Sequence, residues 1–529
     1  MQYKEVFIGM STKELDLVII GAGATGSSIA LEACKRGLKV ALIDQGDISG
    51  GTSCRSTKLL HGGVRYLELA FKNFDLAQLK LVREALFERG YWLKNAPFLT
   101  REIELAIPTS NCFNKGYYRL GLAIYDLLSG SQRISHSRIL SSQEISTKLP
   151  YLGNCTGGGV AYSDGQFNDS RLNLLLALTA EREGAIIANY CNVIDFEYDL
   201  NSKLKAVITQ DLSSTQKRWE AKVIINATGI QADAIREKVD PNVEKRITTS
   251  RGVHIVLNEN LCPDNLGLLL PATEDGRVLF ALPFFNHTLV GTTDTPCDIS
   301  NARQPSKEEE QYLINHVKVL FPRILKPTIK SRWAGGRPLL QPKETASSSQ
   351  IVREHEIELL PCGLISAMGG KWTTCRKIAL DTLNVVEEAI GKSLVEVKNI
   401  PLLGSNINTY ETKLALEKQR NELKKYLPQT NLLEKQIMHL EGKYGLRALE
   451  LIQSNKENDR EPLSEIIPIC SAEIIEDINY EHAKTATDIL ARRSRLAMID
   501  YEEAIRLLPI VQKYLSEASL PNEDLNLKS

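Results

Sequence analysis

The chain has 529 residues and lacks the long apolar stretch that a membrane-spanning helix needs. No run approaches the roughly 18–20 apolar residues that cross a bilayer. The N-terminal segment MQYKEVFIGMSTKE has two acidic residues and no long apolar run, so we do not expect a signal peptide. The formal net charge of -1 gives no support for a nucleic-acid partner.

Cysteine is present but lacks the spacing that holds metals or redox disulfides. The ten cysteines are scattered, and no two stand at C-x-x-C spacing. This pattern predicts small buried residues in a reducing compartment and no zinc site. We find no internal repeat. A hydrophobic content of 43% and a charged content of 24% are typical of globular proteins, and the length predicts two or three domains.

The strongest signal lies in residues 16–44, DLVIIGAGATGSSIALEACKRGLKVALID. An apolar run at 17–20 predicts a buried parallel strand, residues 27–36 a helix, and residues 40–43 a second strand. Glycines at 21, 23 and 26 give G-x-G-x-x-G spacing, which allows a tight turn, close approach of a pyrophosphate, and close packing of helix on strand. The helix N-terminus attracts phosphate, and Asp44 would accept hydrogen bonds from a ribose 2′-OH. The sequence therefore predicts binding of an adenine dinucleotide.

Three later segments repeat this glycine-rich style. Residues 50–66, GGTSCRSTKLLHGGVRY, combine glycines with basic side chains, which suits backbone packed against a cofactor. A strand at 223–225 ends in Asn-Ala-Thr-Gly at 226–229. A short strand after residue 363 runs into Gly369-Gly370-Lys371 and a helix.

Periodicity predicts the remaining elements. We expect helices at 75–93, 116–128, 171–182 and 307–321, and strands at 185–193, 204–210, 219–225, 253–257, 278–283 and 288–291. Residues 156–169 are interpreted as a turn-rich boundary, residues 241–342 as a β-rich layer, and residues 410–529 as helical.

Taken in order, these segments resemble the FAD-dependent glycerol-3-phosphate dehydrogenases. The resemblance rests on GAGATG at 21–26, TSCRSTKLLHGGVRYLE at 52–68, GTTDT at 291–295, GGRPL at 335–339, GGKWTTCRK at 369–377 and DILARRSRLAMID at 488–500. It implies an α/β fold with a Rossmann-like FAD domain of the glutathione-reductase type, a β-rich substrate domain and a C-terminal α-helical domain. The expected FAD domain combines 14–95, 155–240 and 345–395, the substrate domain combines 96–154 and 241–344, and the helical domain is 400–529. That family usually has Glu at the position of Asp44.

The resemblance implies oxidation of sn-glycerol 3-phosphate to dihydroxyacetone phosphate, with hydride transfer from C2 to flavin N5. Removal of the hydroxyl proton needs a base, and His61 and His254 are candidates because imidazole titrates near neutral pH. Each of them can equally be a structural histidine. Lys371 would stabilise negative charge on reduced flavin or on the substrate oxygen.

The substrate phosphate calls for arginine, whose planar fork binds two oxygens. The resemblance points to Arg65, Arg337 and Arg353, with Tyr66 orienting the substrate. FAD contacts are assigned to the glycine turns, to the segment after the second strand and to Val193. These residues are Gly21, Ala22, Gly23, Ala24, Thr25, Gly26, Asp44, Gln45, Thr52, Ser53, Ser56, Thr57, Lys58, Leu59, Val193, Ala227, Thr228, Gly229, Gly369, Gly370, Lys371, Thr373 and Thr374.

The resemblance also implies a quinone acceptor and a cytoplasmic protein peripherally associated with the inner face of a membrane. Three alternatives remain open at this point. They are an oxidase of the same fold that uses oxygen and releases hydrogen peroxide, another FAD-dependent amine or hydroxy-acid oxidoreductase of the superfamily, and a non-catalytic redox sensor or FAD-binding tRNA-modifying protein. The sequence leaves the oligomeric state open, with a homodimer as one alternative.

Overall fold

The structure is a computed structural model that describes residues 15–64, 76–109, 111–153, 157–263, 265–271, 273–341, 355–396 and 398–527. The chain divides into two compact units. Unit 1 comprises Met1–Ser53, Asn173–Thr248 and Arg337–Ile400, and unit 2 comprises Cys54–Leu172, Thr249–Gly336 and Pro401–Ser529. The three-domain boundaries expected from the sequence stay a prediction.

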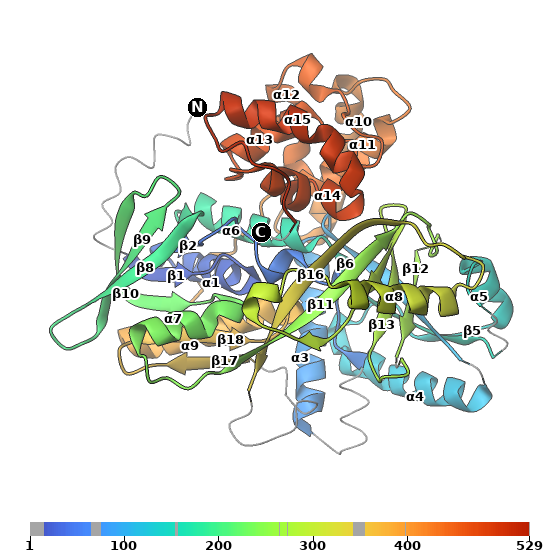
Figure 1. Ribbon diagram of the computed structural model, residues 1–529, viewed down its shortest axis with the longest axis horizontal. Helices are drawn as coiled ribbons and strands as arrows, with labels where there is room; N and C mark the ends of the chain where they lie inside the picture. The colour runs from blue at the N-terminus through green and yellow to red at the C-terminus, as the bar shows by residue number, and fades with distance from the viewer. Residues whose placement is uncertain are drawn as a thin grey trace. The chain divides into compact units, whose positions relative to one another are not determined.

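Unit 1 is built on an eight-stranded sheet in which six strands follow the order β17-β18-β10-β1-β2-β7 (Figure 1). Its strands are β1 (Leu15–Ile20), β2 (Val40–Ile43), β7 (Ile186–Ala188), β8 (Cys191–Tyr198), β9 (Leu204–Asp211), β10 (Gln216–Asn226), β17 (His355–Leu359) and β18 (Leu364–Gly369). The strands β7, β2, β1, β10 and β18 run parallel to one another. Their carboxyl ends therefore lie along one edge, where doubly wound sheets bind nucleotides.

Helices pack on one face of this sheet, and the antiparallel β8–β9–β10 meander packs on the other. The helices of this unit are α1 (Ala24–Lys35), α6 (Asp169–Arg182, whose first residues belong to unit 2), α7 (Ala232–Val239) and α9 (Cys375–Ile390). α1 packs against α9, and Ile19 of β1 faces α1 at Gly26. Val18 and Ile20 point to the other face and join a core with Val207 and Trp219 of the β8–β9–β10 meander. The expected strand–turn–helix–strand unit at 16–44 is confirmed, because β1, α1 and β2 have nearly the predicted bounds.

The single strand expected at 185–193 is wrong in detail. The segment forms two strands, β7 and β8, because Tyr190 adopts a left-handed conformation (φ 57°) and turns the chain between them. β7 completes the parallel sheet beside β2, whereas β8 pairs antiparallel with β9.

Unit 2 contains a ten-stranded sheet, with eight strands in the order β15-β11-β14-β13-β12-β4-β6-β3 and with β16 and β5 paired to β11 and β6. The strands are β3 (Leu59–Leu60), β4 (Thr100–Pro108), β5 (Arg138–Leu140), β6 (Gly159–Phe167), β11 (Ile247–Leu257), β12 (Leu266–Leu270), β13 (Leu279–Phe284), β14 (His287–Gly291), β15 (Thr295–Pro296) and β16 (Ile329–Leu340). The first residues of β11 and the last residues of β16 belong to unit 1. The predicted β-rich character of residues 241–342 is confirmed, and α8 (Lys307–Leu320) is the helix expected within it.

The interpretation of residues 156–169 as a turn-rich boundary is wrong. β6 spans nine of these positions, every one of them buried, and pairs with β3, β4 and β5. Its glycines mark close approach of neighbouring strands rather than turns, since a Cβ on Gly159 would lie 2.6 Å from the carbonyl oxygen of Ile107.

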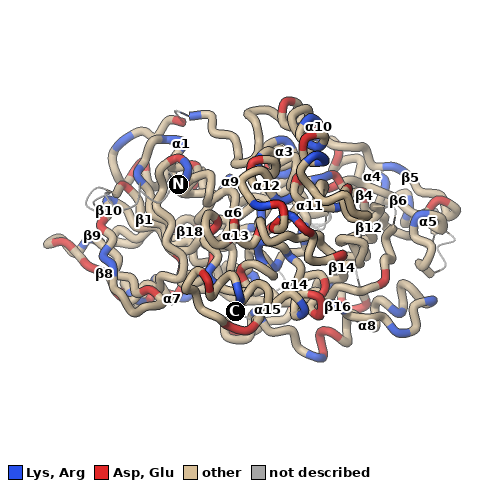
Figure 2. Tube along the Cα trace, turned by 90° about the horizontal axis from the view of Figure 1, so that it is seen from above, with Lys and Arg blue, Asp and Glu red and all other residues tan. Residues whose placement is uncertain are grey.

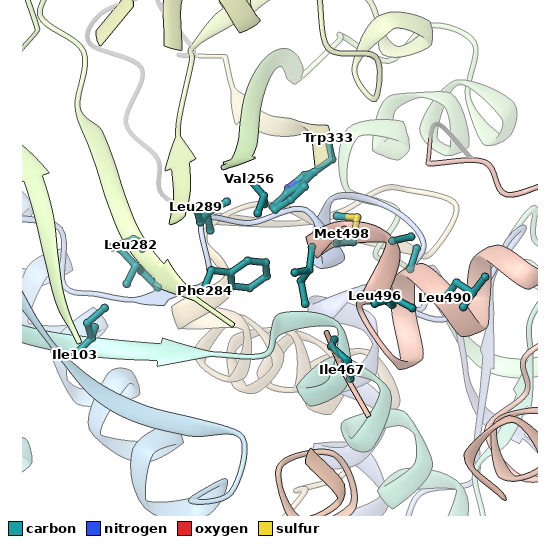
Figure 3. Close-up of a cluster of buried hydrophobic side chains, with 14 of the residues drawn as sticks. Ile103, Val256, Leu282, Phe284, Leu289, Trp333, Ile467, Leu490, Leu496 and Met498 are labelled. Atoms are coloured by element: carbon teal, nitrogen blue, oxygen red, sulfur yellow. The ribbon is translucent and has the colours of Figure 1, made fainter. Parts of the chain in front are cut away.

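The helices of unit 2 are α3 (Leu76–Asn95), α4 (Cys112–Leu128), α5 (Ser142–Lys148), α8, α10 (Thr409–Tyr426), α11 (Leu433–Tyr444), α12 (Ala448–Ser454), α13 (Ser471–Asn479), a π-helical turn η10 (Asp488–Arg493), α14 (Leu496–Ile499) and α15 (Tyr501–Glu517). α5 and α8 cover one face of the sheet. The other face shares one core with the last helices, where Val256, Phe284 and Trp333 meet Leu496 and Met498 (Figure 3).

The helices α10 and α11 carry basic and acidic residues interspersed along their length (Figure 2). Ion pairs join them, with Lys424 2.6 Å from Glu434 and Arg420 2.6 Å from Glu441. Within the residues that the structure describes, no helix is both long and apolar enough to cross a membrane.

Candidate functional site

The glycine turn of unit 1 depends on backbone contacts that exclude a side chain. Gly21 has a φ of 103°, and a Cβ there would lie 2.6 Å from the carbonyl oxygen of Ala227. A Cβ on Gly26 would lie 1.8 Å from the carbonyl oxygen of Gly21. The first glycine therefore permits the turn and the third permits the packing of α1 on β1, as the spacing predicts.

The N-terminus of α1 is arranged to receive an anion. Its N-cap is Gly23, which has no side chain to cap the helix, and the first turn contains no acidic residue. The amide of Ala24 donates to the hydroxyl oxygen of Ser53 at 2.9 Å. Because unpaired amides and the helix dipole attract phosphate, these residues fit the pyrophosphate of a dinucleotide.

Asp44 directly follows β2 as predicted, and its carboxylate accepts a hydrogen bond from the glycine turn after β1. One carboxylate oxygen accepts from the amide of Ala22 at 2.7 Å and the other from the amide of Gly46 at 2.8 Å. A carboxylate oxygen has two acceptor positions, so these bonds are compatible with a ribose contact. That contact stays a prediction, as does a contact by Gln45, whose amide donates to Gln231 at 2.8 Å.

Two further predicted turns follow strands that neighbour β1. Residues 227–229 follow β10, and Gly229 is left-handed with a φ of 61°. Gly369 and Gly370 end β18 with φ values of 74° and 80°, and Lys371 precedes a short turn into α9. The sheet thus brings three backbone turns from distant parts of the sequence to one edge. Val193 lies elsewhere in unit 1, buried in β8 against the meander core.

His254 is held in a single orientation within unit 2. Its Nε2 lies 3.0 Å from the hydroxyl oxygen of Thr57, and its ring stacks on Trp333 with centroids 5.6 Å apart. Gly291 faces the ring, where a Cβ would lie 2.3 Å from the imidazole. The residue is buried. His61, the other candidate base, is half-buried and follows β3 directly.

Lys58 was expected to contact the cofactor, and its side chain is engaged within unit 2. The buried ammonium donates to Asp169 at 2.6 Å and to the carbonyl oxygen of Cys54 at 2.9 Å, and lies 5.2 Å above the ring of Trp333. Burial lowers the pKa of Lys58 to about 7, and the charge of Arg495 acts in the same direction, whereas Asp169 raises it.

Of the remaining predicted catalytic and substrate-binding residues, the structure describes two and leaves three outside its described ranges. Arg337 is half-buried near the end of β16, and Lys371 is half-buried. Arg65, Tyr66 and Arg353 lie outside the described residues. The proposed roles of all of these residues stay predictions.

Sequence reasoning missed Asp164, Asp169 and Trp333. Both aspartates lie in the segment SDGQFND, whose polar and glycine residues are typical of a turn. Trp333 precedes the GGRPL motif, and a tryptophan beside such a motif was the available signal for it.

A parallel sheet with a G-x-G-x-x-G turn and two further turns at the same edge defines a dinucleotide-binding oxidoreductase fold. The family model for FAD dependent oxidoreductases matches residues 16–375, and that for the C-terminal domain of alpha-glycerophosphate oxidase matches residues 395–520. The cofactor is therefore FAD.

Comparison with individual related proteins identifies the family more closely. The chain is 39% identical to the probable mitochondrial glycerol-3-phosphate dehydrogenase of Dictyostelium discoideum, over 94% of this chain and 80% of that protein. It is 36% identical to the mitochondrial glycerol-3-phosphate dehydrogenase of Homo sapiens, over 94% of this chain and 70% of that protein. The structure of a Bacillus halodurans glycerol-3-phosphate dehydrogenase with FAD matches with a TM-score of 0.77 and 26% identity, over 96% of this chain and 91% of that one. The chain belongs to the FAD-dependent glycerol-3-phosphate dehydrogenase family.

Proposed function

We propose that this chain oxidises sn-glycerol 3-phosphate to dihydroxyacetone phosphate. The observation that carries the proposal is the similarity, over 94% of the chain, to proteins named glycerol-3-phosphate dehydrogenases. FAD supplies the hydride acceptor, flavin N5. The chain itself must bind the phosphate, orient the C2 hydroxyl and take its proton.

We assign the proton transfer to His254, with His61 as the second candidate. A general base must keep one orientation while the hydroxyl proton moves to its ring nitrogen. His254 meets this requirement through the Thr57 hydroxyl, the Trp333 ring and the side-chain-free face at Gly291. His61 lies four residues after Thr57 in the sequence. Replacing each histidine in turn and comparing the rates of flavin reduction tests which of the two takes the proton.

The phosphate dianion is assigned to arginines Arg65, Arg337 and Arg353, with Tyr66 orienting the substrate. Arginine binds phosphate through two parallel hydrogen bonds. Lys371 is assigned to charge stabilisation next to the cofactor, since it follows the paired glycines at the end of β18.

An anaerobic titration tests the activity directly. Stoichiometric glycerol 3-phosphate should bleach the visible absorbance of the bound flavin, and dihydroxyacetone phosphate should appear in equal amount. Glycerol, glycine and proline serve as controls for the phosphate and for amine oxidation. Bleaching by an amino acid but not by glycerol 3-phosphate would contradict the proposal.

We further propose that a quinone reoxidises the flavin. The relatives are named dehydrogenases rather than oxidases, which supports a non-oxygen acceptor. Turnover with a short-chain quinone should exceed turnover with oxygen, measured as hydrogen peroxide. Predominant peroxide formation would favour the oxidase alternative. A homodimer is retained as a proposal that light scattering of the holoenzyme tests.

A membrane surface is the partner that we propose for α4. One face of this helix carries Phe113, Tyr117, Leu120 and Leu127 at helical spacing. Phe113, Tyr117, Leu120 and Leu127 are exposed, the first and last by 83% and 77%, whereas the opposite face of the helix packs into the sheet core. Aromatic and aliphatic side chains on one face of a helix suit the headgroup region of a bilayer.

A further inference from the structure

The segment from Cys54 to Gly63 lies against β6 and is fixed at both of its ends by buried carboxylates. Its central residues form β3, in which Leu59 pairs with Gln166 and Leu60 with Gly165 of the antiparallel strand. Asp169, which begins α6 just after β6, holds the first part of the segment. Asp164, within β6, holds the last part through Tyr125.

The Asp169 carboxylate contacts several groups at the beginning of the segment. One oxygen accepts from the Ser56 amide at 3.1 Å, from the Ser56 hydroxyl at 2.7 Å and from the Lys58 ammonium at 2.6 Å. The other oxygen lies 3.3 Å from the guanidinium of Arg495. Arg495 also donates to the carbonyl oxygen of Cys54 at 3.0 Å, which is the same oxygen that Lys58 contacts. Asp169, Lys58 and Arg495 are all buried.

Two residues of this network have an uncommon backbone conformation. Lys58 and Arg495 both have left-handed backbones, with φ values of 63° and 69°. Long side chains adopt this region only where the surroundings fix it. Both residues contact the Asp169 carboxylate, so this carboxylate is part of the surroundings that fix them.

The Asp164 carboxylate fixes the other end. It accepts from Arg89 at 2.8 Å and from the Tyr125 hydroxyl at 2.8 Å. The Tyr125 oxygen in turn accepts from the amide of Gly62 at 2.8 Å. A Cβ on Gly62 would lie 2.7 Å from Leu86, so the backbone at this position fits its neighbours closely.

The segment held in this way carries Thr57, which contacts His254, and His61, the second candidate base. We propose that Asp164 and Asp169 are positioning residues for the reaction, and that Arg495 makes the helical C-terminal segment part of the same support. The proposal rests on the proposed function. It assigns these residues no contact with substrate or cofactor, and their effect reaches the chemistry through Thr57 and His61.

Positioning predicts a specific kinetic defect. A small displacement of a reacting group lowers the rate of the chemical step by about a hundredfold without a matching loss of binding. In Asp169→Asn, Arg495→Gln and Tyr125→Phe holoenzymes we therefore expect flavin reduction at saturating glycerol 3-phosphate to slow by about ten- to a hundredfold. The apparent Kd for glycerol 3-phosphate should stay near the wild-type value. Arg495→Lys should recover part of the rate because it keeps the charge.

The experiment is anaerobic stopped-flow of the FAD-loaded enzyme, with rates expressed per bound flavin and measured as a function of pH. The matched control is Asp500→Asn. This buried aspartate also pairs with a lysine, Lys330 at 3.1 Å, and accepts a backbone amide, that of Glu503 at 3.1 Å, but both partners lie outside the Cys54–Gly63 segment. It should lower thermal stability and leave the reduction rate and its pH profile unchanged.

The outcomes separate the two proposals. If wild-type flavin is not reduced by glycerol 3-phosphate, the proposed function fails and the inference fails with it. If the wild type is reduced and all three variants with full flavin keep its rate and pH profile, only the inference is wrong. A rate loss of the same size in Asp500→Asn would also overturn it, because the effect would then be general destabilisation. If Asp169→Asn does not retain FAD, Tyr125→Phe, which removes a single hydroxyl, decides the question.

Discussion

The imidazole of His254 lies parallel to the indole of Trp333, with 14° between the ring planes and 5.6 Å between their centroids. Trp333 also lies beneath the ammonium of Lys58 at 5.2 Å. One indole therefore contacts the candidate base and the lysine of the Cys54–Gly63 segment. Such aromatic contacts contribute about 0.5–1.5 kcal/mol beyond the area that they bury.

Replacing Trp333 with Leu should therefore slow flavin reduction per bound flavin by about tenfold, because the ring of His254 loses its support. Trp219→Leu is the matched control. Trp219 is equally buried, in the meander core of unit 1, and its indole nitrogen donates to Thr209 at 2.9 Å. The control should lower the melting temperature and leave the reduction rate of the folded enzyme unchanged. Equal rate losses in both variants would show that Trp333 has no specific role.

Arg337 tests the assignment of the phosphate site. Arg337→Ala should lower kcat/KM for glycerol 3-phosphate by about 30- to several-thousand-fold, since truncating one partner of a buried charged pair costs about 2–5 kcal/mol. FAD content should stay near normal, and Arg337→Lys should restore only part because lysine lacks the fork. Glycerol should be an equally poor substrate for Arg337→Ala and for the wild type.

The control for Arg337 lies on the same strand. Arg332 is exposed and pairs with Glu310 at 2.8 Å. Exposed ion pairs contribute little, about 0–1 kcal/mol, so Arg332→Ala should keep full activity. If Arg337→Ala keeps near-normal kcat/KM with full flavin, Arg337 does not bind the substrate phosphate.

The glycine turn gives a test of FAD retention. Gly26→Ala should abolish FAD binding or folding of unit 1, because the new Cβ would lie 1.8 Å from the Gly21 carbonyl oxygen. Gly37→Ala is the control, since a Cβ at that position meets nothing within 4 Å although its φ of 75° remains unfavourable for alanine. It should cost about 1 kcal/mol and keep a full complement of flavin, measured as the ratio of visible to ultraviolet absorbance. A yellow Gly26→Ala protein with normal flavin content would contradict the close-packing argument.

The parts of the fold that the sequence predicts are those with local signals. The apolar run, glycine spacing and second apolar run at 16–44 lie within one short stretch, and β1, α1 and β2 form as expected. The same holds for Gly369 and Gly370, whose positive φ values explain why glycine stands there. β6 was missed because its glycines serve close approach between strands, and the neighbours that they approach come from β3 and β4.

The support of the candidate site has no local signal at all. Asp169 meets Lys58 and Arg495 only because β3 lies on β6 and because η10 and α14 pack in the same core. Taken alone in the sequence, Asp169 and Arg495 read as ordinary charged surface residues, and Lys58 is predicted as a cofactor contact rather than as a partner of Asp169. Their burial and pairing depend on contacts between distant segments, which periodicity and spacing do not report.

Stability should depend on pH through Asp477 in the C-terminal helices. Burial raises the pKa of Asp477 to about 8, and the charge of Glu481 acts in the same direction. The cations Lys443, Arg171 and Arg493 act against this rise. Between its ordinary value of 3.8 and about 8, the folded state binds more protons than the unfolded state. The contribution of this group to stability is therefore complete at low pH and is lost as the pH rises through this window.

The loss amounts to at most about 1.4 kcal/mol per pH unit. Asp477→Asn does not titrate, so its unfolding free energy should fall less steeply than that of the wild type from about pH 6 to 8. Asp524→Asn, at an exposed aspartate, should follow the wild-type curve. Parallel curves for the wild type and Asp477→Asn in denaturant unfolding would show that Asp477 does not govern this dependence.

The exposed face of α4 gives the test of the proposed membrane surface. Burying a leucine side chain in an apolar environment contributes about 1.5–3 kcal/mol. The double variant Leu120→Glu/Leu127→Glu loses two such contributions and adds two negative charges next to anionic lipid. Its affinity for phosphatidylglycerol-containing vesicles should therefore fall by more than about a hundredfold, as measured by co-sedimentation. Turnover with a soluble dye acceptor should not change, because α4 keeps its buried face.

The matched control uses Leu200 and Leu212, two exposed leucines in the turns of the β8–β9–β10 meander. Leu200→Glu/Leu212→Glu makes the same change in charge at two other exposed leucines, but it lies outside α4. Because both double variants lose equal net charge, a difference between them isolates the contribution of the α4 face from general electrostatic repulsion by the lipid. Equal weakening by both variants would assign binding to net charge alone. A wild-type protein that does not sediment with vesicles at low salt would remove α4 as a lipid-binding surface.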